Sequence, residues 1–254
     1  MNNTKKSIPN TDSNRWMTLF SVIVGALAVI LDGGLMGLIA PAVSQDLGTS
    51  PTTISLISAI SMLMLAAFIL GGGTLGDIYG RKRILSYGLI GITITSILAI
   101  LSPGAGLLIV VRALAGIMAA LVNPMALAII TVTFDQEERP KALGVYGAAL
   151  GVIGGLGTIA IAFLNQQFGW RATFGLIILL AIISLIMVSR FVGESKAGGT
   201  KRVDWAGILL TAVGLFGIVY GVNQAGTNGF LSSAVLVPAG IGVILMVVLV
   251  FYSR

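Results

Sequence analysis

The chain is 254 residues long, and 56% of these residues are hydrophobic while only 9% are charged. Soluble domains carry about 25% charged residues, so this composition excludes a water-soluble globular enzyme. The sequence contains neither cysteine nor histidine, which excludes disulfide bonds, thiolate or imidazole metal sites and histidine-dependent catalysis. An all-α, polytopic membrane protein remains, with a net charge of +6. We expect no metal and no cofactor.

Eight apolar runs are long enough to cross a bilayer, which takes about 20 residues of helix. Each run ends at a polar, proline-containing or glycine-containing break. Ser50 and Pro51, for example, form an N-cap followed by a first-turn proline. The predicted spans are 19–43, 52–76, 84–101, 107–134, 142–164, 172–192, 205–222 and 231–252. The predicted organisation is a polar tail (1–18), a six-helix bundle (19–192), a basic linker (193–203) and two additional transmembrane helices (204–254).

Basic residues predict the orientation of the chain. Thirteen of the fifteen Lys and Arg residues fall at the two ends of the chain or in alternate loops, among them Lys5, Lys6, Lys201, Arg202 and Arg254. Because cytoplasmic loops are enriched in Lys and Arg, we predict both termini in the cytoplasm and a multi-pass protein of the plasma membrane. These charges separate apolar runs, so nucleic acid is not an expected partner.

Two ionisable residues, Asp32 and Arg112, interrupt the first and fourth spans. A charge at membrane depth costs roughly 2.5 kcal/mol or more and is tolerated where it faces a cavity or a partner. A rise of about 1.5 Å per residue puts both at similar depth, in the outer half of the membrane. Asn123 follows Arg112 by about three turns and shares its helix face. We predict a water-accessible cavity lined by these three residues, which couples protons to substrate binding; the alternative is a static interhelical salt bridge.

The fifth span carries a repeat of small residues. Gly147, Gly151 and Gly155 follow one another at four-residue spacing. Small residues at this spacing let helices approach closely in lipid, so we predict a helix-packing face. Glycine also weakens a helix, which would help this span to bend.

The loop between the second and third spans reads Gly73-Thr-Leu-Gly-Asp77-Ile-Tyr-Gly80-Arg81-Lys82-Arg83. Asp77 ends one helix, Gly80 permits the reversal of the chain, and the basic triplet begins the next helix. The triplet alone would serve as a simple anchor at the cytoplasmic face. An aspartate beside it can form a network that holds neighbouring helices in one state. We therefore interpret Gly73, Asp77, Gly80, Arg81 and Lys82 as a conformational lock.

At this loop the chain resembles the major facilitator superfamily. The family's signature, Gly-x-Leu-x-Asp-x-x-Gly-Arg-Lys, matches at Gly73, Leu75, Asp77, Gly80, Arg81 and Lys82. The run 31–41 is similar to an element of the fourteen-span drug/proton antiporter branch, as are 170–174 and 204–207. The run 112–116 is similar to the family's Arg-x-x-Gln-Gly element, with Ala115 in place of Gln. The resemblance implies proton coupling or substrate binding at Asp32 and Arg112, and a conformational lock at Asp77 and Arg81.

The chain departs from that branch in two ways. The antiporter signature of the fifth span, Gly-Pro followed by a glycine pair, corresponds to 157–162, where the proline and the later glycines are missing. The family also has two six-helix bundles, with two extra spans between them in this branch. This chain supplies one bundle and the two extra spans. Alternating access needs one bundle to move against another, so a single bundle lacks its partner wall.

We therefore predict the N-terminal part of a multidrug-type efflux transporter, truncated or split. The expected partners are a lipophilic or cationic small-molecule substrate, protons, the lipid bilayer and a C-terminal six-helix half. The alternatives are a non-transporting remnant or assembly partner, and a transporter of a small polar metabolite. Expressed alone, the chain is expected to insert into the membrane but to move no substrate.

Overall fold

The computed structural model describes residues 12–197 and 204–252. The predictions for Lys5, Lys6, Lys201, Arg202 and Arg254 lie outside these residues. The described chain forms eight helices, each long and apolar enough to cross a membrane, which confirms the eight predicted spans. They are α1 (Asp12–Leu47), α2 (Pro51–Tyr79), α3 (Arg81–Ile100), α4 (Ala105–Thr133), α5 (Arg139–Phe168), α6 (Trp170–Phe191), α7 (Trp205–Asn228) and α8 (Ser233–Tyr252).

The breaks between helices follow local chemistry. Ser50 caps α2, because its hydroxyl accepts a hydrogen bond from the backbone N–H of Thr53 at 3.2 Å, and Pro51 occupies the first turn. Gly80 separates α2 from α3 with a φ of 114°, a conformation that side-chain-bearing residues rarely adopt. Gly169, with a φ of 82°, separates α5 from α6 in the same way.

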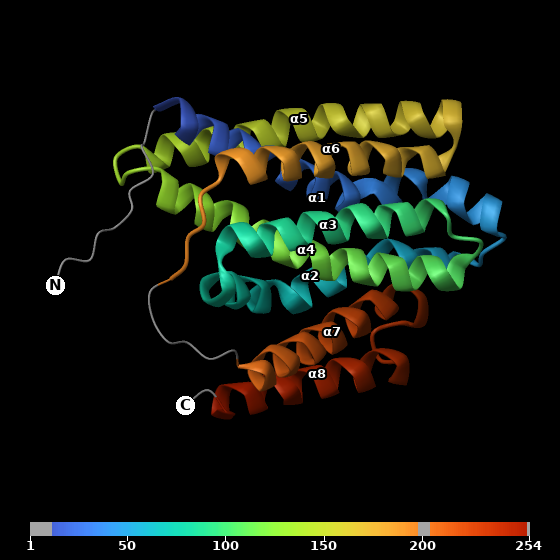
Figure 1. Ribbon diagram of the computed structural model, residues 1–254. Helices are drawn as coiled ribbons and strands as arrows, with labels where there is room; N and C mark the ends of the chain where they lie inside the picture. Colours follow the sequence, from blue (N-terminus) through green and yellow to red (C-terminus); the bar gives the residue numbers. More distant parts are fainter. Residues whose placement is uncertain (1–11, 198–203, 253–254) are drawn as a thin grey trace.

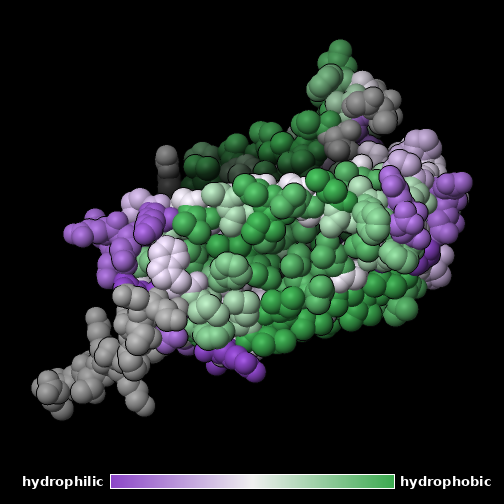
Figure 2. Space-filling view, turned by 90° about the horizontal axis from the view of Figure 1, so that it is seen from above, coloured by the Kyte–Doolittle hydropathy of each residue, from purple (hydrophilic) through white to green (hydrophobic). Residues whose placement is uncertain are grey.

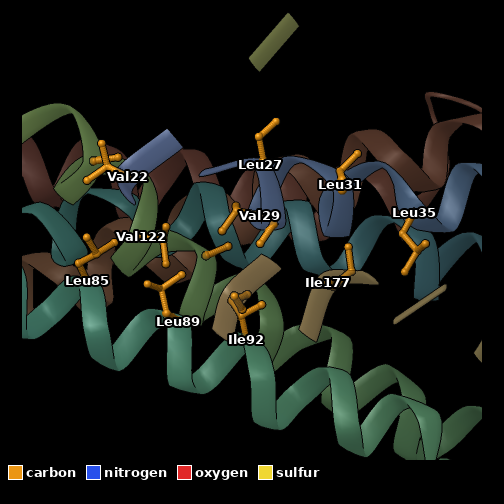
Figure 3. Close-up of a cluster of buried hydrophobic side chains, with 14 of the residues drawn as sticks. Val22, Leu27, Val29, Leu31, Leu35, Leu85, Leu89, Ile92, Val122 and Ile177 are labelled. Carbon is orange, nitrogen blue, oxygen red and sulfur yellow. The ribbon is translucent and has the colours of Figure 1, made fainter. Parts of the chain in front are cut away.

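Helix α1 lies inside the bundle, in contact with α2, α4, α5 and α6 (Figure 1). Its side chains meet those of α3, α4 and α6 in one continuous apolar core (Figure 3). Leu27, Leu89 and Ile177, for example, are fully or almost fully buried in this core. Burial of each such side chain contributes roughly 1.5–3 kcal/mol, so the core holds the functional side chains of α1 and α4 in place.

The helices α7 and α8 form a hairpin outside the six-helix bundle, packed through α7 against α2 (Figure 1). The two helices approach closely at glycines: a Cβ on Gly217 would lie 2.7 Å from the carbonyl oxygen of Pro238. Contact with the bundle uses Gly71, whose added Cβ would lie 2.9 Å from the side chain of Ile208. Helix α5 runs along the opposite edge of the bundle from this hairpin.

Apolar side chains cover the middle of the molecular surface, and hydrophilic side chains gather at its two ends (Figure 2). Large exposed hydrophobic residues lie on the outer faces of the helices, for example Phe20, Ile159 and Val248. Such a belt is unfavourable in water and favourable in hydrocarbon, because transfer of apolar side-chain surface out of water lowers the free energy. The chain is a multi-pass membrane protein.

Two predicted segment boundaries need correction. Helix α1 begins at Asp12, so the described residues 12–18 of the predicted polar tail belong to a helix. Residues 193–197 of the predicted linker are bound to the α2–α3 loop by hydrogen bonds, a contact that the sequence did not predict. The remaining linker residues, 198–203, lie outside the described chain.

The packing role predicted for Gly147, Gly151 and Gly155 finds no partner within the described chain and stays a prediction. A Cβ added at any of the three would meet nothing within 4 Å. Close contacts through glycine lie elsewhere in the bundle, for example between α2 and α4, where a Cβ on Gly72 would overlap the carbonyl of Ala120. The glycine face of α5 therefore has no partner among the described residues.

Candidate functional site

Asp32 on α1 and Arg112 on α4 form an ion pair inside the bundle. The Nη1 of Arg112 donates to Asp32 Oδ1 at 2.6 Å, and its Nη2 donates to the backbone carbonyl of Asp32 at 2.9 Å. One guanidinium thus binds both the carboxylate and the main chain of α1, which defines the position of the two helices relative to each other. The direct contact agrees with a similar depth for the two residues, and their place in the outer half of the membrane stays a prediction.

Both side chains of this pair are buried, with relative exposures of 2% for Asp32 and 1% for Arg112. The expected opening to water is therefore absent around the pair in this conformation, and the geometry matches the alternative of an interhelical salt bridge. Among the described residues, the buried Nε of Arg112 has no hydrogen-bond partner. A buried charge-bearing group with an unmet donor is costly, so this position has capacity for another acceptor.

Helix α4 reaches this position because its glycines and alanines allow close packing. A Cβ on Gly116, one turn after Arg112, would overlap the backbone carbonyl of Ser61 on α2. Ala115 is buried at 2% exposure, so the position that carries Gln in the related element is here part of the apolar packing. The Arg112 guanidinium consequently sits among hydrocarbon and relies on Asp32 for its charge partner.

Asn123 does not join the ion pair. It shares a face of α4 with Arg112, but it lies about 16 Å further along the helix axis at a rise of about 1.5 Å per residue. No hydrogen bond connects it to either residue within the described chain. It precedes Pro124, which is 4.0 Å from a Cβ built on Gly73. Asn123 therefore lies closer to the predicted lock than to the Asp32–Arg112 pair.

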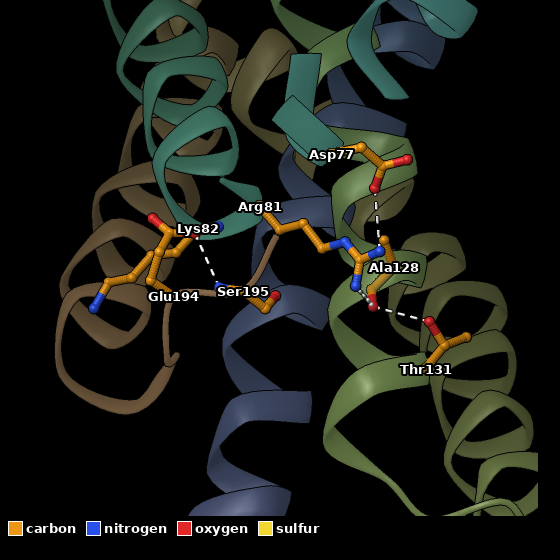
Figure 4. Close-up of polar contacts among 7 residues, drawn as sticks. All are labelled: Asp77, Arg81, Lys82, Ala128, Thr131, Glu194 and Ser195. Carbon is orange, nitrogen blue, oxygen red and sulfur yellow. Dashed lines mark hydrogen bonds and ion pairs between the residues drawn. The ribbon is translucent and has the colours of Figure 1, made fainter. Parts of the chain in front are cut away.

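Three of the predicted lock residues, Asp77, Arg81 and Lys82, lie together where α2 ends and α3 begins (Figure 4). Arg81 donates to the carboxylate of Asp77 at 3.1 Å and makes a longer contact of 3.5 Å to the carbonyl of Ala128 on α4. Lys82 donates through Nζ to the carbonyl of Ser189 on α6 at 2.9 Å. The loop thereby touches α2, α3, α4 and α6. The exposed fraction of the Asp77 side chain is 35%, so its ion pair with Arg81 contributes only a few tenths of a kcal/mol.

Sequence reasoning missed Glu194, which binds this loop more extensively. Its carboxylate accepts the backbone N–H groups of Lys82 and Arg83 at 3.1 and 3.2 Å, and so caps the N-terminus of α3. We call residues 193–197 the strap. The backbone N–H of Arg81 donates to the carbonyl of Ser195 at 2.9 Å, and that of Ala197 donates to Asp77 at 3.2 Å.

The strap makes the larger contribution to holding the loop. Four backbone donors are satisfied across it, at about 0.5–1.5 kcal/mol each, against a few tenths for the Asp77–Arg81 pair. Gly80 is required at this point for two reasons: its φ is positive, and a Cβ would lie 2.5 Å from the Glu194 carboxylate. The sequence contained one signal for this contact. Glu194 is a single acidic residue just after the sixth span, and its charge is complementary to that of the basic triplet at 81–83.

A second polar cluster, also missed from the sequence, joins helices at the opposite end of the bundle. Arg171 donates through Nε to the carbonyl of Ile100 at 3.2 Å and through Nη2 to that of Ser102 at 3.1 Å. It also pairs with Asp46 and lies over the ring of Trp170, 4.2 Å from the ring centre. Because Trp170 donates to Asp46 as well, the ends of α1, α3 and α6 are tied together.

The family model of the Major Facilitator Superfamily matches residues 22–254. The chain belongs to this superfamily. Its members are membrane transporters and not enzymes, in agreement with the resemblance drawn from the loop, and the superfamily fold accounts for a six-helix bundle with the signature loop between its second and third helices.

Curated relatives within the superfamily are drug-resistance and export proteins. Puromycin resistance protein pur8 of Streptomyces alboniger is 32% identical, over 96% of this chain and 48% of its own length. Tetracenomycin C resistance and export protein of Streptomyces glaucescens is 31% identical, over 89% and 44%. Multidrug efflux pump LfrA of Mycolicibacterium smegmatis is 29% identical, over 94% and 47%. The chain spans about half the length of the curated relatives it matches.

Solved structures of the superfamily share the fold. The POT family transporter PepTSo aligns with a TM-score of 0.69 and 12% identity, over 95% of this chain and 52% of that one. The proton:xylose symporter XylE aligns with a TM-score of 0.61 and 14% identity, over 93% and 54%. At these identities the likeness concerns the fold alone.

Proposed function

We propose that the chain is the N-terminal half of a drug-efflux transporter in which Asp32 and Arg112 couple export to proton movement. The observation that carries the proposal is the fully buried ion pair between α1 and α4, in a chain whose relatives are resistance and export proteins. An ionisable pair at membrane depth is costly, and such residues mark ion and substrate pathways.

The coupling follows because the Asp32 carboxylate binds one partner at a time: Arg112, a cationic substrate or a proton. While the transporter is empty, Asp32 neutralises Arg112, and the two charges cancel inside the hydrocarbon. A cationic substrate that reached Asp32 would compete with Arg112 for the carboxylate, and a proton bound to Asp32 would remove the site for the cation. Proton and substrate thereby exclude one another, which is the requirement for their exchange.

The bundle acts with a second set of six helices under this proposal. Support comes from the relatives, which are about twice as long as this chain, and from the unpartnered glycine face of α5. Gly147, Gly151 and Gly155 would pack there against a helix of the second half, since bare backbone permits close approach in lipid.

The loop at Gly73, Asp77, Gly80, Arg81 and Lys82 acts as the conformational lock in this proposal. Its supporting observation is that the loop and the strap connect the ends of α2, α3, α4 and α6. A change in the relative position of these four helix ends must break those bonds. The lock would therefore stabilise the conformation described above against its alternative.

The test is dye efflux from membrane vesicles that contain this chain together with the second half of a full-length relative. We expect proton-dependent efflux of a lipophilic cation from the combined halves and none from this chain alone. Asp32→Asn should abolish efflux without reducing membrane insertion. Glu137→Gln, an exposed carboxylate in the loop between α4 and α5, is the control and should retain efflux.

Normal, proton-dependent efflux by the Asp32→Asn variant would remove Asp32 from the mechanism. Efflux from vesicles that hold only this chain would refute the half-transporter proposal. Insertion is checked separately by protease protection of the basic loops, so that a folding defect is not mistaken for a transport defect.

A further inference from the structure

A crevice of about 200 Å³ lies between the bundle and the α7–α8 hairpin, at the end of the hairpin where α7 begins and α8 ends. Three helices contribute to its walls. Hydrocarbon side chains from α2, α7 and α8 form one part and three polar side chains form the other. Its principal lining residues are Leu70, Thr74, Asp204, Ile208, Thr211 and Leu249.

The polar side chains of the crevice offer hydrogen-bond acceptors and no donors. The hydroxyl of Thr74 donates its single proton to the carbonyl of Leu70 at 3.1 Å, and that of Thr211 donates to Gly207 at 2.7 Å. Both oxygens keep lone pairs. Asp204 is a carboxylate, which accepts only. A ligand that fits this lining must therefore bring donors.

Among the residues that the structure describes, the charged side chain that lines the crevice is a carboxylate. Asp204 caps α7 by accepting the backbone N–H of Gly207 at 2.8 Å, and it accepts the hydroxyl proton of Tyr252 at 3.2 Å. Two bonds leave capacity on a carboxylate, which has about four acceptor positions. The positive end of the α7 dipole lies beside the negative end of α8, so the two helix dipoles offset each other and the carboxylate charge remains.

We propose that this crevice binds an ammonium group carried on a hydrocarbon chain. The N–H groups would donate to Asp204, Thr74 and Thr211, and the hydrocarbon would lie against Leu70, Ile208 and Leu249. The same chemistry is found in an ethanolamine phospholipid and in a lipophilic amine. The site is separate from the Asp32–Arg112 pair, so it stands or falls independently of the transport proposal.

Trp205 provides the measurement, because it adjoins Asp204 and its side chain is 58% exposed. The full chain is placed in lipid nanodiscs with a trace of phospholipid that carries brominated acyl chains, which quench tryptophan fluorescence. The brominated lipid has an ethanolamine, choline or glycerol headgroup. A Trp205→Phe variant isolates the Trp205 signal from those of Trp16 and Trp170.

We expect the ethanolamine lipid to quench Trp205 at about tenfold lower mole fraction than the choline lipid, which has no N–H donor, or the anionic glycerol lipid. Asp204→Asn retains an N-cap oxygen but removes the charge, so it should abolish the preference while the helix content stays unchanged. Glu137→Gln, an exposed carboxylate in the loop between α4 and α5, should keep the preference.

Competition with dodecylamine, with dodecanoate as the control, identifies the source of the ammonium. Relief of quenching by dodecylamine alone assigns the crevice to alkylammonium compounds in general. No relief, with the headgroup preference intact, assigns it to the phospholipid. Equal quenching by ethanolamine and choline lipids, or an unchanged preference in Asp204→Asn, would overturn the proposal.

Discussion

Replacement of the Asp32–Arg112 pair by apolar residues tests whether the two charges depend on each other. Asp32→Leu leaves the guanidinium of Arg112 buried at 1% exposure with no carboxylate, which costs about 3–5 kcal/mol of unfolding free energy. Arg112→Met leaves the carboxylate, which can neutralise itself by binding a proton, whereas a guanidinium cannot. We therefore expect the second variant to lose less stability than the first.

The double variant Asp32→Leu/Arg112→Met removes both charges from the bundle interior. Replacement of a buried ion pair by apolar residues of similar volume is often neutral or stabilising by about 1–4 kcal/mol. The double variant should accordingly be more stable than Asp32→Leu by about 3 kcal/mol or more, which is the signature of two coupled residues. It should nevertheless lose any transport that depends on Asp32.

The assay is reversible unfolding of the purified chain in mixed micelles, followed by helix content, for the wild type and the three variants. Additive losses, in which the double variant is the least stable of the four, would refute the reasoning. They would mean that Asp32 and Arg112 each contribute through separate contacts, and that the 2.6 Å ion pair is not the interaction that stabilises the α1–α4 contact.

Two further predictions concern glycine packing and the strap. Gly72→Ala places a methyl group into the carbonyl of Ala120 and should destabilise the chain by about 1–3 kcal/mol, measured by the same unfolding assay. Gly147→Ala meets only open space and should be neutral or slightly stabilising in the isolated chain, so equal losses in the two variants would contradict the packing described here. Glu194→Ala removes the cap of α3 and should cost about 0.5–2 kcal/mol, with faster hydrogen exchange at the amide of Lys82. Unchanged exchange there would show that the strap does not hold the loop.

Local chemistry in the sequence was sufficient to predict the membrane helices and the loop between α2 and α3. Spans of about 20 apolar residues have no other stable form in hydrocarbon, so their number followed from length alone. Ser50 and Gly80 act on their own backbone or on residues within a few positions, and the sequence placed both correctly. Asp32 and Arg112 could be paired because membrane thickness limits the depth at which each lies.

Other contacts between distant segments could not be predicted in this way. The repeat of Gly147, Gly151 and Gly155 has the same spacing as a packing face, yet these glycines meet nothing in the described chain, whereas Gly72 on another helix packs closely. Spacing shows that close approach is possible and not which helix makes it. Glu194 binds backbone groups more than a hundred residues earlier in the chain, and no periodicity records such a contact.

The sequence by itself determined the set of membrane helices and the two charges that hydrocarbon does not tolerate singly. Both follow from the free energy of transferring individual residues from water to hydrocarbon. The tertiary structure decided that Asp32 and Arg112 meet in a closed contact, that Asn123 lies elsewhere, and that the strap binds the loop. These outcomes depend on how helices pack against one another. Packing is determined by the shapes of two contacting surfaces together and not by either segment alone.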